Sequence, residues 1–206
     1  MPPSLPILFT TLLAYVLGGL PFGYWFVRLS TGKDIRTMGS GNIGATNVHR
    51  TSGGKAGIIV LLLDILKGYL AVLIAALVNG KDPNALALAV VAVVLGHCYP
   101  VFLRFKGGKA VACFVGAFLY VAPLALGITT LVFFAVFALT RYVSLASILG
   151  ALLFPVILWL LQSYSLPILL AGTVTSLLIV FRHRANIERL LKGKEHVFTL
   201  KGGKTA

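Results

Sequence analysis

The chain has 206 residues, of which 58% are apolar and only 11% are charged, and its mean hydropathy is +0.97. Soluble domains carry about 25% charged residues, so this composition argues against that class and indicates a membrane protein with several spans. The formal net charge of +13 would suggest nucleic-acid binding in a soluble chain. In a membrane protein it indicates basic cytoplasmic loops that contact anionic lipid or an anionic substrate.

Apolar runs of membrane length follow one another along the chain. The first covers residues 5–27, and no lysine or arginine precedes it, so we expect a retained span rather than a removable signal peptide. A helix needs about 20 residues to cross a hydrocarbon core of about 30 Å. No linker or repeat divides the chain, so we expect one domain over residues 1–206. The later runs cover residues 57–78, 85–103, 143–161 and 166–181.

Residues 110–140 form an ambiguous run, because a helix of this length would measure about 46 Å. Pro123 and Gly127 lie near its middle. Two spans would place three basic regions, which hold fifteen of the eighteen lysines and arginines, on one side of the membrane together with Arg141. The positive-inside rule favours that arrangement over one tilted span, and a re-entrant pair is a further alternative. We therefore predict an all-α polytopic membrane protein with about seven transmembrane helices, the N-terminus outside and the C-terminus cytoplasmic.

A polar loop after the first span carries the run Gly-Ser-Gly-Asn-Ile-Gly-Ala-Thr-Asn at residues 39–47, followed by Arg50. Glycines let successive backbone N–H groups converge on an anion, and hydroxyls and amides add neutral donors. Arg50 adds a planar cation suited to phosphate or carboxylate. An ordinary glycine-rich turn is the alternative, but the added polar groups favour an anion site. Its candidate residues are Ser40, Gly41, Asn42, Gly44, Thr46, Asn47 and Arg50.

The spacing of Gly39, Gly41 and Gly44 also matches the dinucleotide-binding fingerprint, and Asp64 lies about twenty residues further on. However, a membrane-length apolar run rather than a short strand precedes the glycines, and Asp64 lies inside another such run. No Lys-Ser or Lys-Thr follows the glycines, which excludes a Walker loop. We therefore expect no nucleotide cofactor and no other cofactor.

The spans themselves contain few reactive side chains. Asp64 and Lys67 stand at i and i+3 in the second span, so they can share one helix face. Because a charge at mid-membrane costs about 2.5–3.5 kcal/mol, the pair forms either a polar wall of an active cavity or a structural ion pair. Cys98 and Cys113 show no Cys-x-x-Cys spacing, so we expect neither a disulfide framework nor a metal site.

A second polar cluster follows the third span. Gly107 and Gly108 lie between Lys106 and Lys109 and predict a second anion nest, with Lys109 at the start of the next helix, where the helix dipole favours an anion. His97 can hydrogen-bond a phosphate or act as a base near neutral pH. A hydrogen bond from His97 to a helix carbonyl is the alternative.

A third cluster lies in the basic tail. A helix over this tail places several polar side chains around one amphipathic turn. His183 and Glu188 have the spacing of an H-x4-D/E acyltransferase box, but positions i and i+5 do not share a helix face, so we regard this match as chance. The candidates in the tail are His183, Asn186, Glu188 and Arg189. Arg141 and Ser144, at another predicted helix boundary on the same side of the membrane, are added to them.

The three clusters together resemble the three motifs of the PlsY family, the bacterial acyl-phosphate:glycerol-3-phosphate acyltransferases. The similarity extends over nearly the whole chain. One departure is that the family often continues Gly-Thr-Glu-x-Lys, whereas Lys194 and Val197 stand at the Thr and final Lys positions here, which leaves the role of the tail's end open. The matching segments are Gly39-Ser-Gly-Asn-x-Gly-Ala-Thr-Asn47-x-x-Arg50, Gly96-His97-x-x-Pro100 through Phe105-Lys-Gly-Gly-Lys109, and His183-x-x-Asn186-Ile187-x-Arg189-Leu190-x-x-Gly193-x-Glu195.

The resemblance implies transfer of a fatty acyl group from acyl phosphate to the 1-hydroxyl of glycerol 3-phosphate. The products would be 1-acyl-glycerol 3-phosphate (lysophosphatidic acid) and inorganic phosphate, the first acylation step of phospholipid biosynthesis. It implies a bacterial inner-membrane enzyme with its active site facing the cytoplasm. The expected partners are these two substrates and membrane lipid, with no nucleic acid and no obligate protein partner.

Within this scheme we assign the glycine-rich loop to acyl phosphate and its developing charge, with Ser40 and Asn42 as catalytic residues. We assign Arg50, Lys109, His183 and Asn186 to glycerol 3-phosphate. The base is either His97 or a phosphate oxygen of the substrate, and the absence of a clear Asp/His or Ser/His pair favours the substrate. A transporter for a phosphorylated anion is the rival function, but no internal repeat is visible and the polar groups gather at one face. A non-catalytic scaffold would leave the polar loop unexplained.

Overall fold

The computed structural model describes residues 4–199, and over that range its regular elements are all helical. Five segments are long and apolar enough to cross a membrane. Two of them combine two helices each: α1 (Leu5–Gly19) with α2 (Phe22–Thr31), and α5 (Pro83–Cys98) with η2 (Val101–Leu103). The other three are the single helices α4 (Gly54–Asn79), α7 (Pro123–Thr140) and α8 (Val143–Leu161). The bent pair α9 (Leu166–Arg182) and α10 (Arg184–Leu191) raises the number of candidate spans in the described residues from five to six. The predicted all-α membrane fold is confirmed.

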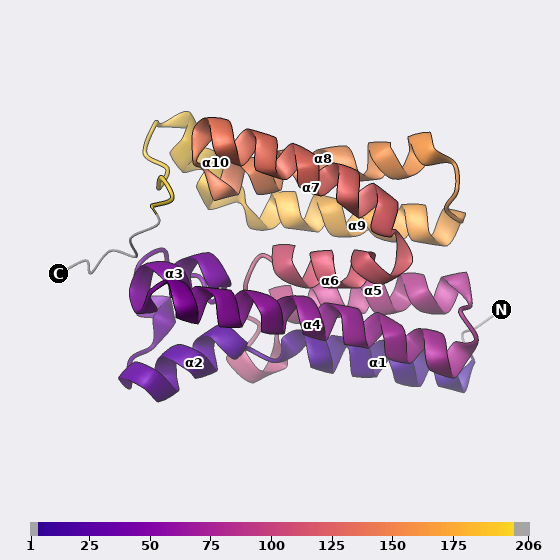
Figure 1. The fold of residues 1–206 in the computed structure, drawn as a ribbon. Helices are drawn as coiled ribbons and strands as arrows, with labels where there is room; N and C mark the ends of the chain where they lie inside the picture. The colour runs from indigo at the N-terminus through magenta and orange to yellow at the C-terminus, as the bar shows by residue number, and fades with distance from the viewer. Residues whose placement is uncertain (1–3, 200–206) are drawn as a thin grey trace.

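The helices form two groups that meet along their lengths (Figure 1). In one group α1 packs against α4 and α5, and α4 packs against α6 (Val111–Val121); in the other α8 packs between α7 and α9. Phe114 and Phe118 of α6 and Phe154 of α8 join the groups, with ring centroids 4.5–4.9 Å apart. These buried rings fix the separation of the two groups and so define the space between α4 and α7.

Glycines bring the helices of the first group into close contact. A Cβ atom on Gly116 of α6 would overlap the carbonyl oxygen of Ile65 in α4, and one on Gly68 of α4 would overlap the carbonyl oxygen of Cys113 in α6. Small residues at membrane helix interfaces allow such backbone approach, and van der Waals packing then holds the helices together.

The ambiguous run 110–140 divides at Ala122 into α6 and α7. α6 has 11 residues and is therefore about 16 Å long, about half of a hydrocarbon core, whereas α7 with 18 residues is membrane-length. The count of seven transmembrane helices stays a prediction. Because successive long segments alternate in direction, the three polar clusters all lie at the end of the molecule where α3 and α10 are seen (Figure 1).

Three local expectations need correction. The first apolar run is broken at Leu20 and Pro21, and the polar loop after it contains the helices η1 (Ile35–Thr37) and α3 (Ala45–Ser52). The second long helix begins at Gly54, three residues earlier than the predicted span. Lys201 and Lys204, which were counted with the basic tail, lie outside the described residues.

Candidate active site

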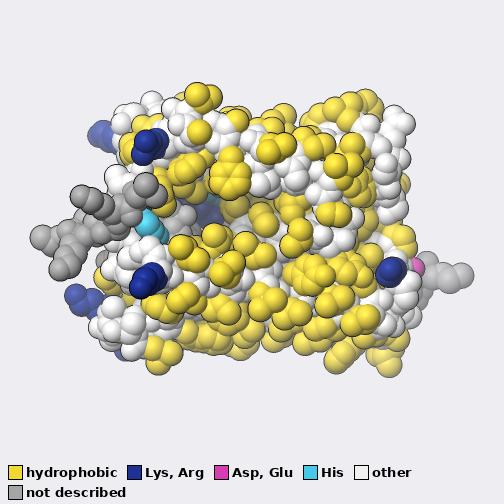
Figure 2. Space-filling model, viewed as in Figure 1, with side chains coloured by type: hydrophobic (Ala, Val, Ile, Leu, Met, Phe, Trp, Pro, Cys, Tyr) yellow, Lys and Arg dark blue, Asp and Glu magenta, His cyan; other side chains and the backbone are white. Residues whose placement is uncertain are grey.

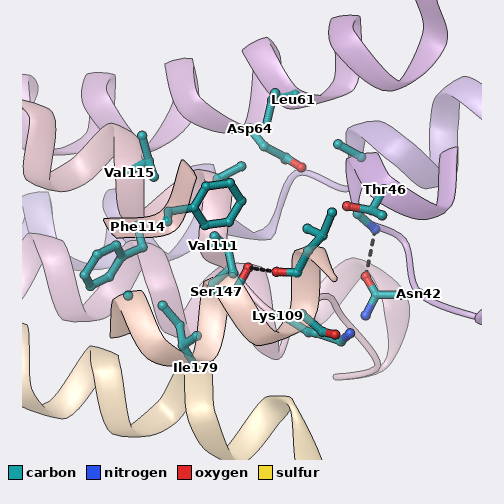
Figure 3. A pocket seen from close by; sticks show the side chains of 18 of the residues that line it. Asn42, Thr46, Leu61, Asp64, Lys109, Val111, Phe114, Val115, Ser147 and Ile179 are labelled. Atoms are coloured by element: carbon teal, nitrogen blue, oxygen red, sulfur yellow. Dashed lines mark hydrogen bonds between the residues drawn. The ribbon is translucent and has the colours of Figure 1, made fainter. Parts of the chain in front are cut away.

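A cavity of about 690 Å³ lies between the two helix groups at the end that carries the polar clusters. Asn42, Thr46 and Lys109 lie toward one end of it and Phe114 and Val115 toward the other (Figure 3). The cavity therefore joins a polar chamber to an apolar arm.

The apolar arm runs between α4 and α7 and reaches the outer surface of the helix bundle. Ile58 and Leu61 of α4 and Phe134 of α7 line the cavity, yet they are 59%, 40% and 58% exposed. Figure 2 shows the surface hollowed between these two helices and surrounded by apolar side chains. A hydrocarbon chain can therefore enter from the side that faces lipid.

The glycine-rich loop forms one wall of the polar chamber. Gly39 and Gly41 have φ angles of 55° and 70°, which glycine adopts without strain, so the chain can turn sharply into α3. Ser40, Asn42 and Thr46 line the cavity beside the N-terminus of α3. The first turn of a helix leaves backbone N–H groups without intrahelical partners and attracts anions.

Asn47 has a different part from the one we assigned to it. Its Oδ1 accepts a hydrogen bond from the Ser40 backbone N–H at 2.8 Å, and its Nδ2 donates to the carbonyl oxygens of Met38 at 3.0 Å and Asn42 at 2.8 Å. Both amide hydrogens are thus used inside the loop. Asn47 holds the loop in shape, although it also lines the cavity.

The Gly107–Gly108 turn also differs from the predicted anion nest. The N–H of Gly107 donates to the Cys98 carbonyl at 3.2 Å, and the N–H of Gly108 donates to the His97 carbonyl at 3.0 Å. Arg182, which we did not select from the sequence, donates to both glycine carbonyls at 2.8 and 3.1 Å. These bonds use the turn's own amides, so the turn positions the neighbouring Lys109 rather than binding an anion itself.

Lys109 begins a chain of hydrogen bonds that ends at the tail. Its Nζ donates to Asn186 Oδ1 at 2.5 Å, Asn186 Nδ2 donates to Glu195 Oε1 at 2.9 Å, and Arg189 Nε donates to Glu195 Oε2 at 2.8 Å. Burial raises the pKa of Glu195, but the hydrogen bonds from Asn186 and Arg189 outweigh it and the net pKa is lowered. Glu195 therefore stays ionised and holds Asn186 in place.

The polar chamber carries an excess of positive charge. Burial is the main cause that lowers the pKa of Lys109 to about 8, and the nearby Arg189, Arg50 and Arg182 lower it further while Glu195 opposes them. Arg50 lines the chamber, and burial also lowers the pKa of its guanidinium. A bound anion would relieve the mutual repulsion of these cations, so the chamber is suited to phosphate.

Three further predicted residues line the cavity. His183 is buried and its Nδ1 lies 2.8 Å from the carbonyl of Ile179. Ser144 is buried at the start of α8, and its neighbour one turn on, Ser147, also faces the cavity. His97 is 5% exposed, with Nδ1 3.8 Å from Asp64 Oδ1 and Nε2 facing Gly108.

Asp64 and Lys67 form the ion pair that their spacing allowed. Their charged atoms are 2.8 Å apart, both side chains are buried, and Lys67 Nζ also donates to the Leu20 carbonyl at 2.8 Å. That carbonyl lies at the break between α1 and α2, so the pair fixes this bend. Asp64 also lines the cavity. The pair is therefore both a structural ion pair and part of the cavity wall, which the sequence analysis had treated as alternatives.

Replacing Asp64 by Asn would leave Lys67 as an uncompensated buried cation. We expect Asp64→Asn to destabilise the protein by about 3–5 kcal/mol, measured as a lower thermal unfolding temperature in detergent. The double change Asp64→Leu with Lys67→Met removes both charges and should recover much of the loss. A double variant no more stable than Asp64→Asn would contradict this explanation.

Some predicted residues lie away from the cavity. Lys106 is exposed, and Glu188 is exposed and pairs with Lys192 at 2.6 Å. Arg141 is also exposed, although its carbonyl accepts a hydrogen bond from the tail. Residues that line the cavity but were not selected include His49, Ser147, Glu195, His196 and Phe198.

Comparison with known proteins identifies relatives of this chain. A family model described as glycerol-3-phosphate acyltransferase matches residues 8–193. The glycerol-3-phosphate acyltransferase of Syntrophotalea carbinolica is 45% identical over 192 residues, 91% of this chain and 95% of the relative. That of Aquifex aeolicus is 44% identical over 191 residues, 93% of this chain and 98% of the relative.

The fold is also similar to solved structures. The crystal structure of PlsY, an integral membrane glycerol 3-phosphate acyltransferase, in its glycerol 3-phosphate form superposes with a TM-score of 0.89 and 44% identity, covering 94% of this chain and 96% of that one. The lysophosphatidic acid form gives a TM-score of 0.86 and 42% identity over the same shares. From its sequence, its fold and the make-up of its cavity, this chain belongs to the glycerol-3-phosphate acyltransferase family of PlsY.

Proposed function

We propose that the protein transfers a fatty acyl group from acyl phosphate to the 1-hydroxyl of glycerol 3-phosphate, releasing lysophosphatidic acid and inorganic phosphate. The observation that carries this proposal is the cavity, in which a cationic chamber continues into an apolar arm open to lipid. In this proposal the chamber holds the two phosphate groups and the arm holds the acyl chain. The PlsY relative in its glycerol 3-phosphate form supports the acceptor.

The donor phosphate would lie against the glycine-rich loop. Ser40, Asn42 and Thr46 line the chamber there, next to the N-terminal end of α3. The acyl chain would then extend past Asp64 toward Phe114, two of the lining residues that Figure 3 labels. In this pose the carbonyl carbon lies at the junction between the chamber and the arm.

Glycerol 3-phosphate would bind between Arg50 of α3 and the wall of the chamber that carries Lys109, His183 and Asn186. Arg50 and Lys109 supply positive charge, and His183 and Asn186 supply groups that can hydrogen-bond its phosphate or hydroxyls. The chain of bonds through Glu195 orients Asn186 and Lys109 before substrate arrives. Positioning of the two substrates at close range, with charge stabilisation, provides the rate enhancement.

In the chemical step the acceptor hydroxyl oxygen bonds to the carbonyl carbon, and the bond from that carbon to the phosphate oxygen breaks. The hydroxyl proton passes to the leaving phosphate. We favour this substrate base over His97, because one nitrogen of the buried His97 ring faces Asp64 and the other faces Gly108. If His97 is not the base, the folded fraction of His97→Ala keeps measurable turnover at saturating substrate. Complete loss of turnover in that folded fraction would make His97 the base.

The decisive experiment measures phosphate release and lysophosphatidate formation by the purified protein given acyl phosphate, with and without glycerol 3-phosphate. Arg50→Ala tests the chamber, and Arg104→Ala, at an exposed arginine outside the cavity, is the matched control. We expect release that depends on glycerol 3-phosphate, strongly reduced in Arg50→Ala only. Binding of glycerol 3-phosphate without turnover of acyl phosphate would exclude the proposed donor.

The pH dependence follows from Lys109. With a pKa of about 8, Lys109 is protonated below that pH and loses its charge as the pH rises through it. Since the charge attracts the substrate phosphate, kcat/KM for glycerol 3-phosphate should fall above about pH 8. Lys109→Arg keeps its charge and should retain activity farther into the alkaline range. A pH profile identical in the two proteins would remove Lys109 from this role.

We further propose that the polar chamber faces the cytoplasm of a bacterial inner membrane. Most of the Lys and Arg side chains visible in Figure 2 gather at the end of the bundle where α3 and α10 lie, as the positive-inside rule requires of a cytoplasmic face. Arg28, Arg36, Arg104 and Arg184 are among the exposed basic residues. Glycerol 3-phosphate then reaches the chamber from the aqueous side. Labelling of a single cysteine introduced at Arg104, in intact cells and in inverted vesicles, tests this orientation.

A further inference from the structure

The segment after α10 closes one side of the polar chamber. We call residues 195–199 the C-terminal strap. Its first residue, Glu195, is fixed by Asn186 and Arg189, and the Phe198 backbone N–H donates to the Arg141 carbonyl at 2.9 Å. Farther along, the Thr199 carbonyl lies 3.0 Å from His49 Nε2. The strap thus runs from α10 across the gap between the α7–α8 corner and α3 (Figure 1).

The side chain of Phe198 occupies this gap. Its ring stacks on the His49 ring of α3, with centroids 4.7 Å apart and planes at 23°. The same ring meets the Phe137 ring of α7 edge-on, with centroids 5.5 Å apart. All three side chains line the cavity. Phe198 is therefore an apolar bridge between the two helix groups at the aqueous end of the site.

An apolar ring at this position has a chemical consequence for an activated donor. Acyl phosphate can lose its acyl group to water as well as to glycerol 3-phosphate. In hydrolysis the water oxygen bonds to the carbonyl carbon and the carbon–oxygen bond to phosphate breaks. One proton then goes to the phosphate, and the other is released from the new carboxylic acid to solvent. Closing an active site against water suppresses such side reactions.

We propose that Phe198 is a specificity-determining residue, which keeps solvent out of the chamber and so favours glycerol 3-phosphate over water as acyl acceptor. The proposal rests on acyl phosphate being the donor. The stacking on His49 also ties the strap to α3, so the cover is held against the wall that binds the donor phosphate.

The test compares the intact protein with Phe198→Ala and Phe198→Leu. Val197→Ala is the matched control, because Val197 lies on the same strap, is 50% exposed and does not line the cavity. For each protein, fatty acid released from acyl phosphate without acceptor and lysophosphatidate formed with saturating glycerol 3-phosphate are measured. We expect Phe198→Ala to raise the ratio of hydrolysis to transfer several-fold. Phe198→Leu should restore most of the selectivity, and Val197→Ala should leave the ratio unchanged.

Two results would overturn the role of Phe198. One is an unchanged ratio in Phe198→Ala; the other is an equal loss of both reactions, which would make the residue a structural support only. Both require that the unmodified protein makes lysophosphatidate from acyl phosphate. If it does not, the proposed donor is wrong, and the role of Phe198 is overturned with it. The two failures are therefore distinguished by the unmodified protein alone.

Discussion

Lys109→Ala is expected to lower kcat/KM for glycerol 3-phosphate by about 100-fold, which corresponds to about 3 kcal/mol. The change removes a cation from the chamber and also leaves Asn186 Oδ1 without its 2.5 Å donor. Both effects weaken the interaction with the substrate phosphate. Steady-state kinetics with glycerol 3-phosphate varied at saturating acyl phosphate provides the measurement.

Lys106→Ala is the control for this prediction. Lys106 stands on the other side of the two glycines, is exposed and does not line the cavity. The sequence placed both lysines beside the predicted anion nest and assigned only Lys109 to glycerol 3-phosphate, and in the structure only Lys109 lines the cavity. We expect Lys106→Ala to keep nearly normal kcat/KM, and equal losses in the two variants would show that general positive charge, rather than the chamber, attracts the substrate.

Gly116→Ala should destabilise the protein by disturbing the close contact between α4 and α6. The added methyl group would overlap the Ile65 carbonyl and push α6 away from α4, and overpacking a well-packed interface costs about 1–3 kcal/mol. Because the same two helices line the cavity, activity should fall with stability. The thermal unfolding temperature in detergent and the yield of folded protein report the change.

Gly127→Ala is the matched comparison for this prediction. Gly127 lies in α7, and a Cβ atom placed there meets nothing within 4 Å. Alanine also favours helix relative to glycine. Its unfolding temperature should therefore equal or exceed that of the unmodified protein. A similar loss in both variants would contradict the role of close backbone contact between α4 and α6.

Much of the fold could be predicted from the sequence because long apolar runs indicate membrane helices. The division near Pro123 was visible for the same reason, since one helix over residues 110–140 is too long for the bilayer. The break at Leu20 and Pro21 was not, because the apolar run continues through it. What stabilises that bend is a distant side chain, Lys67, and no local pattern reports such a contact.

The sequence predicted which residues gather at the candidate site better than it predicted what each residue does there. Arg50, Lys109, His183 and Asn186 all line one chamber, as the grouping of motifs at one membrane face led us to expect. Yet Gly107 and Gly108 use their amides internally. Hydrogen-bond partners depend on tertiary contacts, here with the carbonyls of Cys98 and His97, that spacing alone does not specify.

Arg182 and Phe198 were not selected because little in the sequence distinguishes them. Arg182 is one of many basic residues near the end of the chain, and only its contacts with the glycine turn distinguish it. Phe198 lies beyond the last recognised motif. Its importance comes from two aromatic partners, His49 and Phe137, that are far away in the sequence.

The opening of the apolar arm between α4 and α7 determines how the enzyme can tell one donor from another. A fatty chain that slides in from the bilayer exchanges one hydrocarbon environment for another, so it gains almost none of the free energy that it would gain on leaving water. For the proposed acyl phosphate donor, affinity must then come from its phosphate end. Chains of different length should bind almost equally well, and preference among them must arise from how far each fits along the groove.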